Sequence, residues 1–253
     1  MDTEILQSNL KRLRLSGIAK VLPIRLHEAE VGELPYAKFL EILLSEELNK
    51  RSSNLHNKRL REARFPALKT LDTFDFNFNP TIKRREVQDL LTCRSIVEKR
   101  NVLFIGPPGV GKTHLATALG IAAIEKGYEV CFRSIYNFLD EMAVARATNS
   151  RGVFIKKMVA VPLFILDEFG IKNVPSAFAE DLIEIFHRRY GSGSTVICTN
   201  RPVEDWGEIL GDIPAATSIL DRFLEGISLF KITGPSYRLR ADKTGKNKGK
   251  EEV

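Results

Sequence analysis

The chain has 253 residues, of which 43% are hydrophobic and 28% charged, a composition typical of globular proteins with one large domain or a large and a small one. No apolar run approaches the roughly 20 residues needed to span a bilayer, and the first residues do not resemble a signal peptide, so we expect a cytoplasmic protein without a membrane partner. The three cysteines and four histidines are scattered, which indicates neither a disulfide framework nor a metal cluster.

The positive charge is concentrated at the two ends of the chain. Residues 1–70 contain 13 Lys and Arg against 9 Asp and Glu, and residues 231–253 contain 7 against 3, whereas residues 71–230 contain 18 against 20. The two ends therefore favour contact with a polyanion such as nucleic acid. The alternative is that these basic segments are simply solvated, as basic helix faces and tails commonly are.

Residues 1–68 are predicted to form a small, all-helical N-terminal domain that binds DNA or a partner. Apolar positions recur at helical spacing over residues 2–15 and 18–30, which predicts two helices. A third helix is expected to continue into the basic stretch 57–64 and to end at Phe65-Pro66. Its apolar stripe consists of Leu40, Leu43, Leu44 and Leu48.

Residues 69–240 are predicted to form a second domain, followed by a disordered basic tail over residues 241–253. The segment 71–80 alternates aromatic and small polar residues and ends at a proline, which indicates an extended linker. Its aromatic side chains either fill a surface groove or lie beside a bound base. A helix over residues 83–96 is expected to follow.

Beyond this helix, strands and helices alternate as in a parallel α/β sheet. Strands with both faces covered should be continuously apolar, and the central expected strands are. The expected strands are 102–105, 128–133, 162–166, 195–199 and 227–232, and the expected helices between them are 114–126, 135–147 and 178–190.

A phosphate-binding motif stands between the first strand and the helix that follows it. The residues match the P-loop pattern G-x-x-x-x-G-K-[ST] and are Gly106, Pro107, Pro108, Gly109, Val110, Gly111, Lys112 and Thr113. Glycines let successive N–H groups turn inward around an anion, and the helix adds the positive end of its dipole. Lys112 is expected to reach the β- and γ-phosphates of ATP, and the Thr113 hydroxyl to coordinate Mg²⁺.

Polar residues close the next two central strands. Asp167 and Glu168 follow the apolar strand 162–166 in the Walker B form, so we expect Asp167 to hold Mg²⁺ and Glu168 to polarise the attacking water. Asn200 follows the strand 195–199, where its amide could orient the same water or bind the γ-phosphate. Without the P-loop, the same residues would be an ordinary turn.

Two arginines near the end of the chain are further candidates. In a single subunit Arg222 would be a surface residue in an ion pair, but in a ring or spiral it could reach the γ-phosphate of the neighbouring subunit as an arginine finger. Arg238 could contact phosphate within its own subunit.

Together, these motifs resemble the IstB family, AAA+ ATPases that assist the transposition of insertion sequences and are similar to the helicase loader DnaC. The resemblance extends over about residues 5–240 and rests on Phe74-Asp75-Phe76, GPPGVGKTHLA with its His114, ILDEFG, TNRP followed by Asp205-Trp206, ILDRF, and Ser236-Tyr237-Arg238-Leu239. It implies a P-loop NTPase (AAA+) core with a parallel five-stranded sheet, and an ATPase that self-assembles on duplex DNA and engages an IstA-type transposase. Other AAA+ proteins have a helical lid that carries a sensor arginine. After the expected strand 227–232 there is no room for such a lid, so a short segment must place Arg238.

The resemblance also implies catalytic roles for Lys112, Glu168, Asn200 and Arg222, and a place for His114 beside the nucleotide. A DnaC-like helicase loader would have the same ATP site. A kinase acting on a small metabolite would need an acceptor pocket and a basic lid, and Glu168 beside Asp167 fits water activation better.

DNA contacts are expected from two basic clusters and should involve phosphates rather than base edges, so binding should be independent of sequence. Each cluster could instead be a solvated face. The clusters are Lys58, Arg59, Arg61 and Arg64, and Arg146, Arg151, Lys156 and Lys157.

Overall fold

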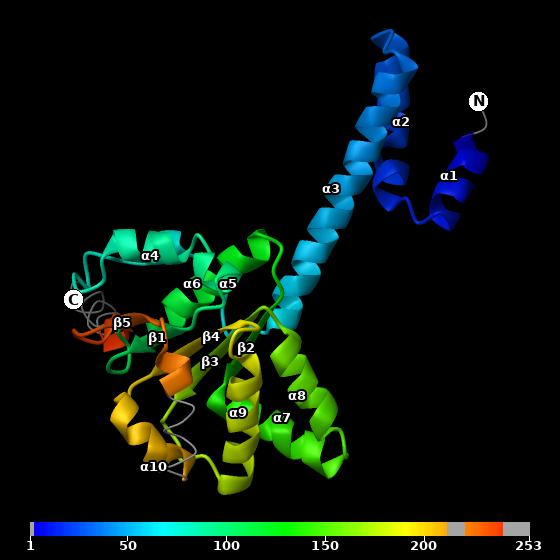
Figure 1. Cartoon of the computed structure of the whole chain (residues 1–253). Coiled ribbons are helices and arrows are strands. Elements are labelled where there is room, and N and C mark those ends of the chain that lie inside the picture. The colour runs from blue at the N-terminus through cyan, green and yellow to red at the C-terminus, as the bar shows by residue number, and fades with distance from the viewer. Residues whose placement is uncertain (1–2, 212–220, 240–253) are drawn as a thin grey trace, which may run out of the picture. The chain divides into compact units, whose positions relative to one another are not determined.

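The structure, a computed structural model, describes residues 3–211 and 221–239. Two units divide the chain after Arg59. The first contains α1 (Thr3–Arg12), α2 (Ser16–Val31) and most of α3 (Tyr36–Ala63), as Figure 1 shows. The last turn of α3 belongs to the second unit. No helix in these described residues is both long and apolar enough to cross a bilayer.

A small apolar core and one buried carboxylate hold the first unit together. The core is built around Leu10, Ile18, Leu22 and Leu43. Glu47 is buried, and its Oε2 accepts hydrogen bonds from the N–H groups of Gly17 (2.7 Å) and Ile18 (3.3 Å) at the start of α2. These N–H groups lack partners within their own helix, so Glu47 of α3 pins the beginning of α2. Of the predicted leucine stripe only Leu43 is buried, while its other three members are exposed.

A parallel sheet of five strands forms the centre of the second unit and confirms the predicted fold class. The strand order is β2-β3-β4-β1-β5, so the P-loop strand β1 lies between the strands that come fourth and fifth in the chain. The strands are β1 (Val102–Ile105), β2 (Val130–Ser134), β3 (Leu163–Phe169), β4 (Ser194–Thr199) and β5 (Ser228–Lys231).

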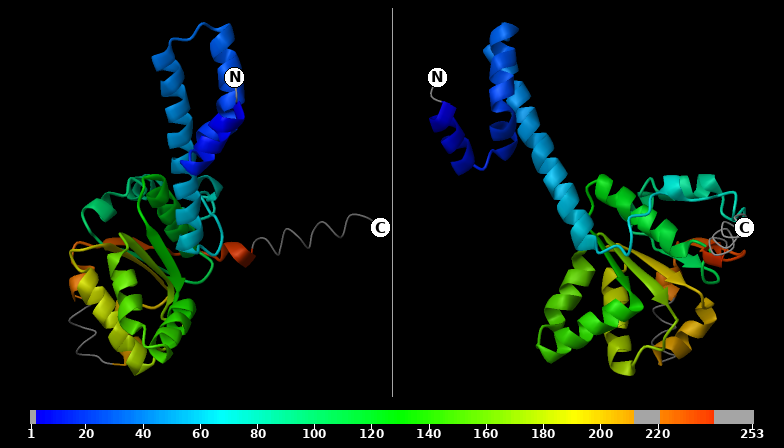
Figure 2. Two further views of the ribbon diagram at one scale, coloured as in Figure 1. Left: turned by 90° about the vertical axis from the view of Figure 1, so that its right-hand side faces the viewer. Right: turned by 180° about the vertical axis from the view of Figure 1, so that it is seen from behind.

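Helices cover both faces of the sheet, as the three views in Figures 1 and 2 show. Along β3, Phe164 and Leu166 join one apolar core, while Leu163 and Ile165 join the other. This alternation explains why the central strands are continuously apolar. One face packs against α4 (Arg84–Leu90), α5 (Arg94–Val97) and α6 (Lys112–Glu125), and the other against α7 (Ile135–Ala147), α8 (Arg151–Ala160), α9 (Ser176–Arg189) and α10 (Trp206–Leu210).

Several elements differ from those predicted. The single helix expected over residues 83–96 is broken into α4 and α5, because Cys93 has a φ of +62°. The linker is not fully extended and contains a 3₁₀ turn, η1 (Leu71–Thr73). The sequence patterns also missed α8, α10 and the 3₁₀ turn η2 (Val203–Asp205). The predicted disordered tail, 241–253, lies outside the described residues.

Arg189, at the end of α9, connects this helix to the end of α8 and to the strand β4. Its side chain is fully buried, and the guanidinium donates to the carbonyl oxygens of Met158 and Val161 (both 2.7 Å) and of Ser194 (2.6 Å). Burial lowers the pKa of Arg189 to about 10. The last carbonyl groups of a helix have no partner within that helix, so the Arg189 side chain satisfies carbonyl groups at the end of α8 and joins them to the start of β4.

Replacing Arg189 with methionine should therefore lower the free energy of unfolding by at least about 3 kcal/mol, because several buried carbonyl groups lose their donor. Urea unfolding followed by fluorescence of Trp206, the single tryptophan and a buried residue of the second unit, measures the effect. The matched control is Arg188→Met, which removes an exposed ion pair with Glu184 and should cost less than about 1 kcal/mol. Equal losses in the two variants would contradict this account of Arg189.

Candidate nucleotide-binding site

The P-loop lies at the carboxyl end of β1 and leads into α6 (Figure 1). Gly109 and Gly111 have φ values of +81° and +106°, which favour glycine. A Cβ atom at Gly111 would lie 2.7 Å from Cε2 of Phe74, and one at Gly109 would lie 2.0 Å from Oγ of Ser236. The loop therefore keeps its shape only with glycine at both positions, and its backbone stays open to a bound phosphate.

Thr113 and Asp167 meet at the start of α6. The Thr113 hydroxyl donates to Oδ2 of the buried Asp167 carboxylate at 2.7 Å, and the other oxygen of Asp167 accepts from the backbone N–H of Glu168 at 2.9 Å. A hydroxyl and a carboxylate at this separation are hard oxygen donors of the kind that Mg²⁺ prefers. This donor set fits the metal site expected from the sequence.

Lys112 lies within the loop that it would serve. Its Nζ donates to the carbonyl oxygens of Gly106 (2.7 Å) and Pro107 (2.8 Å). Burial lowers the pKa of Lys112, and the negative charge of Asp167 acts against this shift. The ammonium group is thus partly desolvated and close to the position that a phosphate on the loop would take.

Glu168 has an unusual backbone conformation next to the metal donors. The pairing of β3 with β4 shifts between Leu166 and Phe169, and Glu168 has a φ of +60°. Such a conformation at a residue other than glycine is strained. Partial burial and then the neighbouring Asp167 carboxylate raise the pKa of Glu168, while Arg238 lowers it. A raised pKa is the direction that suits a general base working near neutral pH.

Asn200 is exposed at the carboxyl end of β4. Because β4 lies between β1 and β3 in the sheet, Asn200 follows the strand that separates the P-loop from Asp167. The structure therefore brings Lys112, Thr113, Asp167 and Asn200 to one edge of the sheet.

A pocket opens beside the P-loop and contains about 680 Å³ of empty space, part of it open to solvent. Phe74 and Phe78 of the linker line it together with Tyr237. The Phe78 and Tyr237 rings meet edge to face, with centroids 5.0 Å apart. Phe76 instead packs against the core under Arg84. The linker aromatics therefore divide between the core and the wall of this pocket, and Tyr237, Thr73 and Asn79 are pocket residues that were not predicted as site residues.

His114 joins α6 to the linker. Its Nε2 lies 2.8 Å from the carbonyl oxygen of Thr70, and its ring meets the Phe74 ring edge to face with centroids 5.0 Å apart. Burial lowers the pKa of His114. It lines the pocket beside the P-loop, and its hydrogen bond fixes the linker that forms the opposite wall.

The two candidate arginines lie in different places. Arg238 lines the same pocket, and the neighbouring Tyr237 donates its backbone N–H to the carbonyl oxygen of Gly109 at 3.0 Å. Arg222 belongs to the helical residues 221–224 and is exposed.

The position of Arg222 follows from its neighbour in the chain. Asn101, the residue before β1, donates its side-chain N–H to the carbonyl oxygen of Phe223 at 3.1 Å. Arg222 is therefore held at the amino ends of the strands, whereas the P-loop lies at their carboxyl ends. The four residues of β1, about 13 Å long, separate the two edges, so the structure does not bring Arg222 to the P-loop of its own chain.

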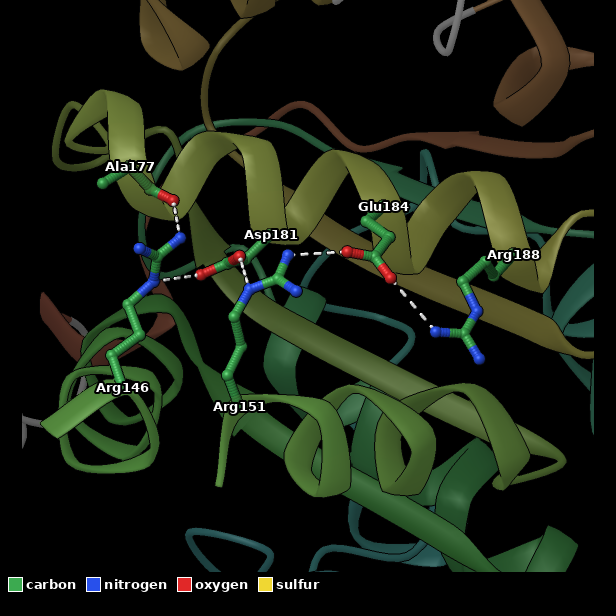
Figure 3. A network of polar contacts seen from close by, with 6 residues as sticks. All are labelled: Arg146, Arg151, Ala177, Asp181, Glu184 and Arg188. Carbon is green, nitrogen blue, oxygen red and sulfur yellow. Dashed lines mark hydrogen bonds and ion pairs between the residues drawn. The ribbon is translucent and has the colours of Figure 1, made fainter. Parts of the chain in front are cut away.

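An ion-pair network gives Arg146 and Arg151, two of the expected DNA contacts, a structural role within the chain (Figure 3). The fully buried carboxylate of Asp181 on α9 accepts from Nε of Arg146 (2.7 Å) and from Nε of Arg151 (2.6 Å). A buried carboxylate needs such partners, so both guanidinium groups hold α7 and α8 against α9. Lys156 and Lys157 are exposed on α8.

In the other basic cluster, Arg64 forms an ion pair with Glu141 of α7, with 2.6 Å between Nη1 and Oε1. Glu141 also pairs with the buried Arg133 at 2.9 Å. Arg64 therefore has a structural partner, while Arg61 is exposed on the last turn of α3.

Comparison with solved structures agrees with this fold. The structure of DnaI superposes on this chain with a TM-score of 0.55 and a sequence identity of 16%. The match covers 65% of this chain and 91% of the DnaI chain. The structure of the DnaC helicase loader is 24% identical, covers 64% and 96%, and has a TM-score of 0.53. At such identities the likeness concerns the fold alone.

Comparison with sequences is more specific. An ATP-binding protein of the insertion sequence IS21 from Pseudomonas aeruginosa is 37% identical, over 94% of this chain and 89% of its own length. The corresponding protein of IS5376 from Geobacillus stearothermophilus is 33% identical, over 95% and 96%. Residues 8–245 match the family described as IstB-like ATP binding protein, and the chain belongs to that family.

Proposed function

We propose that this protein is a DNA-stimulated ATPase that assembles into a ring or helix on duplex DNA and assists a transposase in selecting its target. The observation that carries the proposal is the division of the site between two edges of the sheet. The phosphate loop, the metal donors and the candidate base lie at the carboxyl edge, while Arg222 lies at the amino edge. Two copies stacked head to tail would bring the two parts together.

The residues of one copy hold the nucleotide and position the attacking water. Backbone N–H groups of the P-loop bind phosphate oxygens. Lys112 gives up its hydrogen bonds to the carbonyl groups of Gly106 and Pro107 and binds phosphate oxygens instead. Thr113 and Asp167 hold Mg²⁺, which when bound neutralises charge on the phosphates. Glu168 accepts a proton from the water, and Asn200 orients that water.

Arg222 of the adjacent copy completes the proposed site. An arginine placed against the γ-phosphate stabilises the charge that develops in the transition state. Hydrolysis then requires assembly, because no single copy has both the P-loop and this arginine in reach. Arg238 is proposed to contact the phosphates within its own copy, because it lines the same pocket as Lys112.

The relatives favour a transposase as the partner. The proteins from IS21 and IS5376 are named for insertion sequences, and they match more than nine-tenths of this chain. The DnaC helicase loader resembles it only in fold and over 64% of the chain. A role as a helicase loader therefore has less support than a role beside a transposase.

The DNA contacts are proposed to involve Lys156 and Lys157 on α8 and the basic end of α3, including Arg61. These side chains are cationic and exposed, which suits contact with phosphates. Binding should depend on phosphates and be largely independent of sequence.

Replacing Glu168 with glutamine should lower ATP hydrolysis by about a hundredfold or more while leaving ATP affinity unchanged, because only the proton acceptor is lost. The variant should remain assembled on DNA, which size-exclusion chromatography with ATP and duplex measures. Lys112→Ala should lose ATP binding instead, and Glu180→Gln, an exposed carboxylate on α9, is the matched control. Normal hydrolysis by the Glu168 variant would refute its assignment as the base.

Mixing two inactive variants tests whether Arg222 acts across copies. Arg222→Ala should hydrolyse ATP at no more than about a hundredth of the wild-type rate, and Lys112→Ala should be inactive. An equal mixture should recover up to about a quarter of the wild-type rate, because random assembly joins an intact site to an intact arginine at about one interface in four. If the mixture stays as inactive as its components, Arg222 does not act on a neighbouring site.

Salt dependence tests the proposed DNA contacts. Affinity for a duplex, measured by fluorescence anisotropy, should fall at least roughly tenfold between about 50 and about 200 mM salt, because phosphate contacts release counterions. The change should be similar for duplexes of unrelated sequence. The double variant Lys156→Gln and Lys157→Gln should flatten the salt dependence, whereas insensitivity of the wild-type protein to salt would rule out phosphate contacts.

A further inference from the structure

The backbone next to Arg222 is fixed to the sheet by Asn101. The Asn101 side chain donates to the carbonyl oxygen of Phe223 at 3.1 Å and accepts from the backbone N–H of Thr195 at 3.0 Å. Because Asn101 precedes β1 and Thr195 lies in β4, the short helix 221–224 is anchored to two central strands. The direction that the Arg222 side chain takes then depends on its nearest charged neighbours.

Glu225 is the carboxylate best placed to neutralise Arg222. It stands three residues further along, the spacing at which opposite charges pair on a helix. Glu225 instead accepts a hydrogen bond from the hydroxyl of Tyr190, the residue that follows α9. Arg222 forms no ion pair with any residue in the parts of the chain that the structure describes.

Tyr190 is suited to this contact with Glu225. The Glu225 carboxylate raises the pKa of the Tyr190 hydroxyl, so the hydroxyl remains a donor at neutral pH. Arg222 lies close to this pair, because Tyr190 and Arg222 line the same small pocket at this edge of the sheet. All three side chains therefore belong to one local group at the amino edge of the sheet.

We propose that Tyr190 is a positioning residue that holds Glu225 away from Arg222 and so keeps the guanidinium group available to the ATP site of the next copy. This inference rests on the proposed role of Arg222 as a finger acting across copies. Without the Tyr190 hydroxyl, Glu225 pairs with Arg222 in its own chain. The arginine then has to leave that ion pair before it can reach a phosphate.

The test mixes the Lys112→Ala and Arg222→Ala chains and introduces Tyr190→Phe into one of the two chains at a time. On the Lys112→Ala chain, which donates Arg222, it should lower the recovered ATPase rate roughly two- to fivefold, the factor expected for an exposed ion pair. On the Arg222→Ala chain it should have no effect, because that chain donates no arginine. Tyr136→Phe, which removes the hydroxyl of another partly exposed tyrosine, is the matched control on the donor chain.

A second substitution distinguishes sequestration of Glu225 from simple loosening of the fold. Adding Glu225→Gln to the donor chain that carries Tyr190→Phe should restore the recovered rate, because glutamine cannot form the ion pair. Failure of this rescue, or an equal loss from either chain, would overturn the role of Tyr190. If the mixture without Tyr190→Phe shows no recovery, the proposed finger fails, and the inference fails with it.

Discussion

The parallel direction of the five strands is the constraint on which the rest of the structure depends. It places the carboxyl ends of β1, β3 and β4 side by side, so the P-loop, Asp167 and Asn200 meet although they are far apart in the chain. The same constraint sends the residues that precede the strands to the opposite edge, where Asn101 holds the segment with Arg222. One sheet thus presents two different edges, which two copies can join head to tail.

Charged side chains have separate tasks in this fold. Buried charges stabilise the packing: Asp181 joins three helices through two arginines, and Arg189 donates to the carbonyl groups of Met158 and Val161. Exposed charges on α8 and at the end of α3 are available to a polyanion. The net charge of residues 71–230 does not reveal these two roles, because paired arginines and exposed lysines contribute equally to it.

Local patterns in the sequence were sufficient for much of the fold and for the phosphate site. Apolar runs located all five strands within a few residues, and the P-loop and the Asp167-Glu168 pair are motifs whose spacing follows from their chemistry. The break at Cys93 was not predictable, because nothing in its neighbourhood signals a positive φ. The structural role of Arg146 and Arg151 was also hidden, since their partner Asp181 lies at least thirty residues further along. The pocket walls likewise combine residues 69–79 with Tyr237, which only the folded chain brings together.

The central claim is that ATP joins copies of this chain, with Arg222 of one copy at the phosphate site of the next. The most direct measurement is the mass in solution of the wild-type protein, by light scattering, with duplex DNA and a slowly hydrolysed ATP analogue. The account predicts a complex of several copies that forms only with nucleotide and becomes smaller when Arg222 is replaced by alanine. A mass equal to one copy on the duplex, with the nucleotide bound, would contradict it.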